Sequence, residues 1–264
     1  MNPLRIAVQS NMAIDYITES MATLGLAFEI LRSENPRTAL MQGDIDTYVT
    51  SLADAETDLT VVNTALSPRS DTSFTLLVTP SANDDAQLFR IRAGATVLCL
   101  QDLHAAQLCH YRKDLKTTIV SLDVLLSATQ NADCEAILLP TRYVAAANLA
   151  QFDSIKFNPK ELIDKAGTGI WTWQTLATDV ATRRLLKPIH QSLVSECTNV
   201  ERQIAKHLLS QNTESYGVYC DCNAYKYYNV NVARCNKDTG EVKNIHFSNS
   251  TTFNLADDVI AMLD

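Results

Sequence analysis

Glycine and proline are scarce in this sequence, with seven of each among 264 residues. Long disordered linkers are rich in these residues, so their scarcity argues against such linkers. No stretch reaches the roughly 18 consecutive apolar residues that a membrane-spanning helix needs. The first residues also lack the basic segment and apolar segment of a secretory signal. We therefore expect a cytoplasmic protein with no membrane partner.

Positive charge is also in short supply. Lysine and arginine total 22 against 30 aspartates and glutamates, which gives a formal net charge of −8 and a pI near 5.1. An acidic surface repels phosphate groups, so we expect no nucleic acid partner. It also supplies no broad positive field to attract a polyanionic substrate.

The cysteines do not form a disulfide framework. They are seven in number, widely spaced, and typical of free thiols in a reducing compartment. Cys220 and Cys222 alternate on an expected strand, so a metal site or redox pair with Cys235 and His246 is one interpretation. Metal-binding pairs more often have two or more intervening residues, so we predict a structural role and no metal.

Short apolar runs alternate with helical patterns over the first two thirds of the chain. This alternation favours a largely parallel sheet with helices on both faces. Residues 152–159 are expected to form a loop, and residues 167–169 a turn. The predicted strands are residues 4–8, 27–31, 59–62, 74–78, 95–100, 117–120, 135–139 and 170–174. The predicted helices are residues 12–25, 45–52, 102–112 and 122–130.

The last third has a different pattern. Residues 180–209 are mostly helical in character, with a break expected at Pro188. Three runs then alternate as antiparallel strands do, at 216–222, 225–235 and 242–248, with a hairpin turn at 236–240. Residues 253–263 close the chain as a helix. This order predicts a small α+β domain.

Several short strings, in order and at matching spacings, resemble the hydroxymethylbilane synthase (porphobilinogen deaminase) family over roughly residues 4–235. The strings, with the family's letters, are residues 4–7 (the opening strand), 48–52 (the F-V-K-E-L helix), 94–97 (G-S-V-V), 106–108 (A-Q-L), 113–115 (P-D-L), 136–139 (A-I-I-L), 166–169 (V-G-Q-G) and 200–202 (A-E-R).

The resemblance implies an α/β fold with two doubly wound, periplasmic-binding-protein-like domains around a cleft, followed by a small C-terminal α+β domain. The first domain would comprise residues 1–90 and 164–185. The second would comprise residues 91–163, and the C-terminal domain residues 186–264. An active member would be a deaminating transferase in tetrapyrrole biosynthesis.

The residues that carry the family's chemistry are missing. The family attaches a dipyrromethane cofactor to a cysteine in a G-G-C loop about ten residues after A-E-R, where this chain has Asn212. An amide cannot form the thioether. The family's catalytic aspartate lies in H-S-x-K-D, which we align with residues 62–66, so Leu66 replaces it. We therefore predict no catalytic residue at these positions and no dipyrromethane cofactor.

The arginines that hold the substrate's carboxylates are also absent. The family's L-R-R aligns with Asp102-Leu103-His104, and its R-G-N with Ser121-Leu122-Asp123. Arginine binds carboxylates through two parallel hydrogen bonds, whereas the two aspartates would repel them. His104 could bind an anion when protonated or be a surface histidine. The candidate ligand-binding residues are Ser10, Thr64, Asp102, His104, Ser121, Asp123 and Thr168.

Trp171 and Trp173 alternate on an expected strand and so share one face. They could stack on an aromatic ligand, or fill a domain interface, which is the favoured interpretation.

Three functions remain open. The first is a pseudoenzyme that binds a small molecule or a tetrapyrrole-pathway protein. The second is an active transferase on pyrrole-like substrates, its catalytic groups rebuilt from Cys220, Cys222, His104, Asp102 or Asp123. The third is a two-domain solute-binding module.

Overall fold

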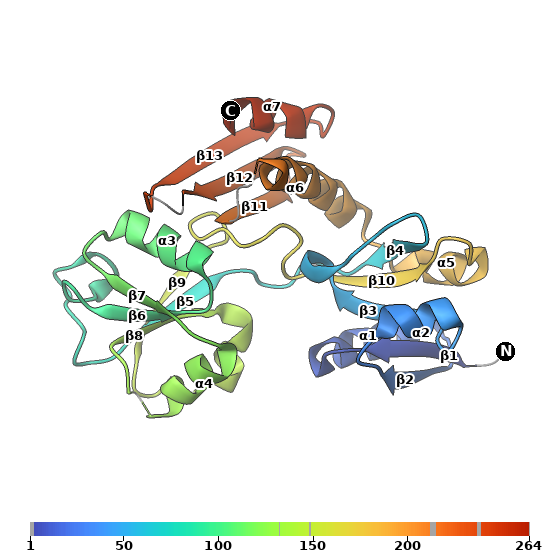
Figure 1. The fold of residues 1–264 in the computed structure, drawn as a ribbon, viewed down its shortest axis with the longest axis horizontal. Coiled ribbons are helices and arrows are strands. Elements are labelled where there is room, and N and C mark those ends of the chain that lie inside the picture. The colour runs from blue at the N-terminus through green and yellow to red at the C-terminus, as the bar shows by residue number, and fades with distance from the viewer. Residues whose placement is uncertain (1–2, 132, 148, 212–214, 237–238, 264) are drawn as a thin grey trace. The chain divides into compact units, whose positions relative to one another are not determined.

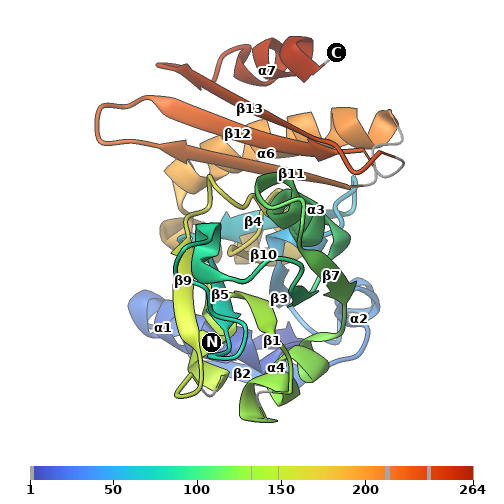
Figure 2. The same cartoon turned by 90° about the vertical axis from the view of Figure 1, so that its left-hand side faces the viewer.

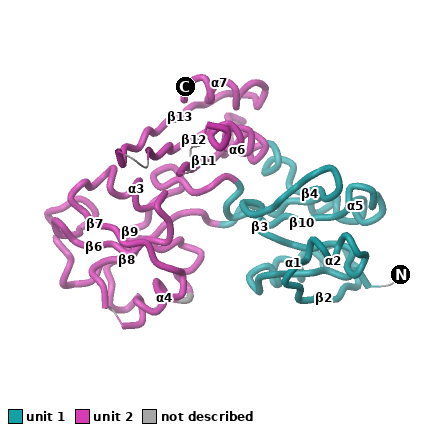
Figure 3. The backbone as a smooth tube through the Cα atoms, in the orientation of Figure 1, with its two compact units in different colours: residues 1–70, 167–196 teal, residues 71–166, 197–264 magenta. Residues whose placement is uncertain are grey.

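Three β-sheets with helices packed on them make up the computed structural model of the chain, which describes residues 3–131, 133–147, 149–211, 215–236 and 239–263 (Figures 1 and 2). The chain divides into two compact units (Figure 3). The first contains residues 1–70 and 167–196, and the second residues 71–166 and 197–264. The three-domain boundaries expected from the sequence stay a prediction.

The first unit holds a five-stranded sheet in the order β2-β1-β3-β10-β4. All its strands are parallel except β10, which runs antiparallel to both neighbours. The strands are β1 (Leu4–Val8), β2 (Phe28–Arg32), β3 (Thr47–Ser51), β4 (Val61–Leu66) and β10 (Trp171–Leu176). The helices of this unit are α1 (Ile14–Leu24), α2 (Pro36–Gln42) and α5 (Val180–Leu186).

The helix expected at residues 45–52 is wrong, because residues 47–51 form β3. The apolar residues at 45, 48, 49 and 52 are spaced as on one face of a helix. A short strand that is buried on both faces also has adjacent apolar residues, as β3 has at Tyr48 and Val49, so this pattern does not distinguish the two. The helix of this segment is α2, just before it. Asn35 caps α2 by accepting a hydrogen bond from the Thr38 N–H, Pro36 occupies its first turn, and Gly43 ends it in the left-handed conformation.

The second unit repeats the same strand pattern in the order β7-β6-β8-β5-β9. β6, β7 and β8 are parallel, and β5 runs antiparallel to β8 and β9. The strands are β5 (Phe74–Val78), β6 (Thr96–Cys99), β7 (Lys116–Ile119), β8 (Ala136–Pro140) and β9 (Asp153–Phe157). The helices are α3 (Asp102–Tyr111) and α4 (Leu122–Asn131).

The loop expected at residues 152–159 is also wrong, since β9 occupies most of it. β9 lies at the edge of its sheet and begins with two exposed polar residues, Asp153 and Ser154. Because an edge strand is partly exposed, the segment lacks the apolar run that predicts a buried strand. Each five-stranded sheet is largely parallel, as expected, with one antiparallel strand, β10 in the first unit and β5 in the second.

The C-terminal part of the second unit is an antiparallel sheet of β11 (Ser215–Cys222), β12 (Tyr228–Cys235) and β13 (Val242–Asn249). One face packs in an apolar cluster with α6 (Ser192–Ser210) and α7 (Leu255–Leu263) (Figure 2). The break predicted at Pro188 lies in a 3₁₀ turn, Lys187–Ile189, before α6. The α/β fold with two doubly wound five-stranded sheets and a small α+β part is therefore confirmed.

The three-stranded sheet packs on α3 and on residues 160–164 of its unit. The Gln107 side chain donates to the Ile163 carbonyl and accepts from the Ile163 N–H, both at 2.8 Å. The Val218 N–H donates to the Asp164 carbonyl at 3.0 Å. A Cβ at Gly217 would lie 2.3 Å from the Ile163 oxygen, so only glycine permits this close approach.

None of the helices in the described ranges is both long and apolar enough to cross a lipid bilayer.

Candidate functional site

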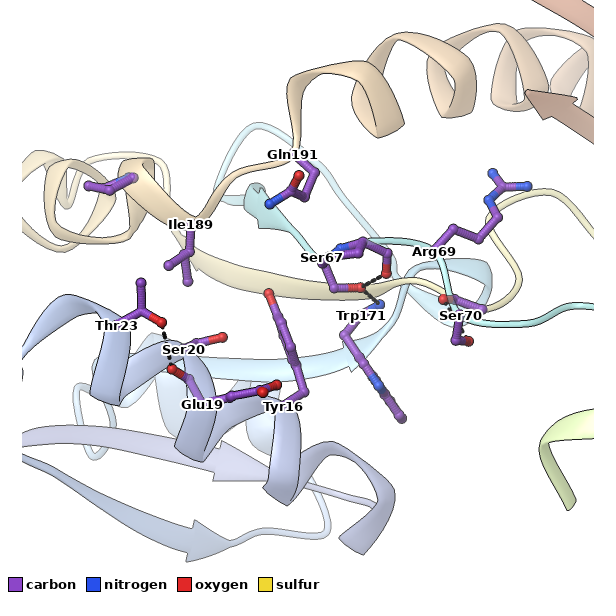
Figure 4. A pocket seen from close by; sticks show the side chains of 13 residues that line it. Tyr16, Glu19, Ser20, Thr23, Ser67, Arg69, Ser70, Trp171, Ile189 and Gln191 are labelled. Atoms are coloured by element: carbon purple, nitrogen blue, oxygen red, sulfur yellow. Dashed lines mark hydrogen bonds between the residues drawn. The ribbon is translucent and has the colours of Figure 1, made fainter. Parts of the chain in front are cut away.

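A pocket of about 530 Å³ lies in the first unit, between α1 and the chain that leads into α6 (Figure 4). One wall is a face of α1, where side chains three and four residues apart lie together. Its lining residues are Tyr16, Glu19, Ser20, Thr23, Ser67, Pro68, Arg69, Ser70, Gly169, Trp171, Pro188, Ile189 and Gln191.

Tyr16 is held in place from behind. The indole N–H of Trp173 donates to the Tyr16 hydroxyl at 3.0 Å, and the two ring centroids are 6.2 Å apart. Trp173 is fully buried, so this hydrogen bond satisfies its only polar group. Burial raises the pKa of Tyr16, while its hydrogen bonds with Trp173 and Ser20 act against that rise. Tyr16 therefore enters the pocket as a neutral phenol in a fixed position.

Three hydroxyl groups of the lining donate to backbone carbonyls of the protein. Ser67 donates to the Pro68 carbonyl at 2.7 Å and accepts from the Trp171 N–H at 2.9 Å. Ser70 donates to the Gly169 carbonyl at 3.0 Å. Thr23 donates to the carbonyl one turn earlier on α1, at 2.9 Å. These hydroxyls keep only lone pairs to offer a ligand.

Three predicted ligand-binding residues lie in the first unit, and no described residue of the pocket lining is one of them. Ser10 accepts from the Met12 N–H at 3.2 Å and caps a 3₁₀ turn. The hydroxyl of Thr64 is 2.6 Å from that of Thr175 on the neighbouring strand. Thr168 is half-buried between Gly167 and Gly169, whose positive φ angles form the predicted turn. Ligand binding by these residues stays a prediction.

Asp102, Ser121 and Asp123 are exposed at the starts of α3 and α4 in the second unit. An acidic residue in a first turn is stabilised by the helix dipole. The Val124 N–H donates weakly to the Ser121 hydroxyl, at 3.5 Å. Helix initiation thus accounts for all three side chains, and a role in binding stays a prediction.

His104 lies inside the second unit and is 1% exposed, so its interpretation as a surface histidine is wrong. Its Nε2 is 3.3 Å from Asp164 Oδ1, and its ring packs on Phe74 with centroids 4.4 Å apart. Arg142 Nη1 lies 3.9 Å from the other oxygen of Asp164. Position 104 is two residues into α3, on the side that faces the core rather than the solvent.

Leu66 is buried in an apolar cluster with Leu52, Ile170 and Val194. Its N–H donates to His190 Nδ1 at 3.2 Å, and its carbonyl accepts from the Gln191 N–H at 3.1 Å. Asn212 lies outside the described residues.

Because β3 is a strand, the chain can also be aligned in a second way with the motif H-S-x-K-D of the family that it resembles. Because residues 47–51 are not a helix, their match to F-V-K-E-L loses its structural basis. Residues 50–54 read Thr-Ser-Leu-Ala-Asp, so Ser51 and Asp54 fit the serine and aspartate of H-S-x-K-D. Asp54 is exposed just beyond β3, and ligand sites of open α/β sheets lie at such carboxyl ends. Had residues 47–51 been predicted as a strand, Asp54 would have been aligned with the aspartate of H-S-x-K-D from the sequence.

The two neighbouring cysteines belong to the packing of the small sheet. Cys220 is 2% exposed, and its N–H donates to a carboxylate oxygen of buried Glu201 at 2.7 Å. Cys222 is half-buried against the same apolar cluster. Cys235 is opposite Ser215, at the other end of β11. No group of three or more metal-binding side chains occurs within the described ranges.

Comparison with known proteins gives one curated relative to report. The chain is 26% identical over 173 residues to a porphobilinogen deaminase from Chloroherpeton thalassium, covering 64% of this chain and 54% of that protein. The chain thus spans about half the length of this relative. No family model matches the chain.

The chain is also similar to solved structures at low identity. One is an ancestral cationic amino acid solute binding protein, with 13% identity, a TM-score of 0.45, and coverage of 80% of this chain and 93% of that chain. Another is a periplasmic domain of BvgS from Bordetella pertussis, with 12% identity, a TM-score of 0.42, and coverage of 70% and 86%.

Proposed function

We propose that this protein is a non-catalytic relative of porphobilinogen deaminase that binds a small molecule or a protein of tetrapyrrole metabolism in the cytoplasm. The sequence similarity to that enzyme supports the link to tetrapyrroles. The observation that supports a loss of catalysis is the burial of His104 against Asp164, at a position where the resemblance implies an arginine for the substrate.

A growing chain of pyrroles accumulates carboxylates and needs several cations to hold it. At α3 the chain offers exposed Asp102 and a histidine already bonded to Asp164. At α4 it offers Ser121 and Asp123. Each charged hydrogen bond contributes about 1.5–3 kcal/mol, so losing several of them removes most of the affinity for such a substrate.

The missing thiol is a second, independent obstacle. If Asp54 supplies the carboxylate, the cofactor still needs a cysteine, and Asn212 stands at that position. Cys220 follows it closely in sequence, but its side chain is buried in the core of the small sheet. A thiol must be accessible and ionised to thiolate to act as a nucleophile. A relocated attachment at Cys220 is therefore disfavoured.

Intact mass spectrometry of the purified protein tests this proposal. We expect the mass of the unmodified chain, no colour with an aldehyde reagent for dipyrromethane, and no product after incubation with porphobilinogen. The Asn212→Cys variant is the matched control, because it restores the thiol alone, and it should also form no product. An adduct on the natural chain, or product from it, would refute the proposal.

An active transferase is the second candidate, and the fit of Ser51 and Asp54 to H-S-x-K-D favours it. In that case product forms from porphobilinogen, and Asp54→Asn abolishes it while leaving the thermal stability unchanged, because Asp54 is exposed. A matched control is Glu56→Gln, which makes the same charge change at an exposed site in the same loop and should leave product formation unchanged.

A further inference from the structure

We infer that the pocket beside α1 binds a small organic cation, with an ammonium group at Glu19 and an apolar body between the aromatic side chains. The site lies wholly within the first unit. It uses neither the cysteine position nor either candidate for the aspartate. The inference is therefore independent of the function proposed above.

The charge of the pocket comes from Glu19. Among the described lining residues it is the one carboxylate, and its oxygens have no hydrogen bond or ion pair with a described residue. Arg69 is the one cation of that lining. It already has a partner, and Figure 4 shows its guanidinium directed away from Glu19 and Tyr16. The free charge offered to a ligand is therefore negative, which favours a cation.

The hydrogen-bonding groups favour a ligand that donates. Ser67, Ser70 and Thr23 donate to backbone carbonyls and have only lone pairs left. The side-chain amide of Gln191, which Figure 4 shows above Tyr16, can both accept and donate a hydrogen bond. An ammonium group has three donors and no acceptor, so it matches such a lining. A carboxylate would meet lone pairs and the charge of Glu19.

The apolar part of the lining suits the body of such a ligand. The rings of Tyr16 on α1 and Trp171 on β10 line the pocket, and Pro188 and Ile189 add further apolar surface. A cation within about 6 Å of an aromatic face is attracted to it. Because Trp173 holds the Tyr16 hydroxyl, that ring needs little ordering when a ligand binds.

The size is also appropriate, because the volume of about 530 Å³ falls within the range of roughly 300–1,000 Å³ typical of small-molecule sites. We propose phenethylammonium as the probe. Phenethyl alcohol and hydrocinnamate serve as its neutral and anionic counterparts of similar shape.

Isothermal titration calorimetry on the full chain, with each probe, tests the inference. We expect phenethylammonium to bind and the two counterparts to bind at least threefold more weakly. Glu19→Gln should raise the dissociation constant of phenethylammonium roughly three- to tenfold, as expected for the loss of a charged contact at a partly open site. Glu34→Gln makes the same charge change on an exposed loop outside the lining and should leave binding unchanged.

A second variant, Gln191→Leu, removes the amide with little change of volume and should also weaken the ammonium probe. Thermal unfolding without ligand checks that each variant is folded. The inference is overturned if phenethylammonium does not bind at millimolar concentration, or if hydrocinnamate binds equally well. It is also overturned if the Glu19→Gln and Glu34→Gln variants bind phenethylammonium with the same affinity. None of these results bears on an adduct or product from porphobilinogen, so the two proposals fail separately.

Discussion

The imidazole Nε2 of His104 lies 3.3 Å from a carboxylate oxygen of Asp164, and both side chains are less than a tenth exposed. His104 belongs to α3, and the Asp164 carbonyl accepts from Val218 on β11. The pair thus lies where the three-stranded sheet meets the α/β part of its unit. A buried carboxylate such as Asp164 is costly unless its hydrogen-bond and charge partners are present.

Replacing one partner of this pair should be costly. Asp164→Asn leaves Arg142 without its counter-charge and removes the carboxylate that His104 contacts, and we expect a loss of about 3 kcal/mol in the free energy of unfolding. Urea denaturation at pH 7 measures it. Asp123→Asn, at an exposed site, is the control and should change stability by less than about 0.5 kcal/mol. Equal effects of the two substitutions would contradict this account.

The same pair predicts a dependence of stability on acid. Burial raises the pKa of Asp164. The interactions with His104, with the Lys165 N–H at 2.8 Å and with the charge of Arg142 lower it by more than burial raises it. The pKa of Asp164 is therefore below its usual value. A lowered carboxyl pKa adds stability above the unfolded value, near 3.9, and that stability is lost as pH falls below it. Urea denaturation between pH 7 and pH 3 should show a smaller loss for Asp164→Asn than for the natural chain.

Gly217→Ala should disturb the packing of the small sheet against residues 160–164 and so destabilise the fold. The new Cβ would lie 2.3 Å from the Ile163 oxygen, which is backbone and cannot move without disturbing its bonds to Gln107. We expect a loss of about 2–3 kcal/mol, as for other overpacked sites, read from the thermal or urea transition. Gly240→Asn is the control, because that glycine has open space around it and asparagine tolerates its positive φ. Comparable losses in both variants would be inconsistent with a steric cause.

Tyr16→Phe removes the acceptor for the buried indole N–H of Trp173. An unpartnered buried donor costs about 1–3 kcal/mol, and urea denaturation should show a loss in that range. Tyr225→Phe removes a hydroxyl from a side chain that is 84% exposed and should have no measurable effect. A Tyr16→Phe variant as stable as the natural chain would mean that another group accepts from the indole.

The thiols should differ in reactivity. Burial raises the pKa of Cys99 to about 12, with a smaller contribution from Cys109, so almost no thiolate forms at pH 8. We expect Cys99 to remain unlabelled by a thiol reagent in the folded protein, while half-buried Cys222 reacts. Peptide mapping after a timed reaction identifies the labelled residues, and labelling in denaturant is the control. Labelling of Cys99 as fast as Cys222 would contradict the burial.

Most of the helices and strands could be predicted from the spacing of apolar residues and from the positions of glycine and proline. The strand at residues 4–8, the helix of residues 14–24 and the hairpin strands of the C-terminal sheet were all predicted close to their observed bounds. β3 was missed because a short strand buried on both faces carries the same apolar run as a helix. β9 was missed because an edge strand needs few apolar residues. In both cases pairing with distant strands decides the structure.

The pocket beside α1 could not be found in the same way. Its lining comes from four separate stretches of chain, including Tyr16 on α1, Ser67 after β4, Trp171 on β10 and Gln191 before α6. The spacing of Tyr16, Glu19 and Ser20 on one helix face was the one local signal. Burial of His104 was equally hidden, since its partner Asp164 is 60 positions away.

The position of β10 between β3 and β4 has a consequence for the order of folding during synthesis. β3 and β4 are joined only through β10, which pairs with both of them, and β10 leaves the ribosome about a hundred residues after β4. Until then both strands have unpaired edges, which are prone to associate with other chains. Nascent chains that stop before Trp171 should therefore aggregate more readily than chains that extend past Leu176.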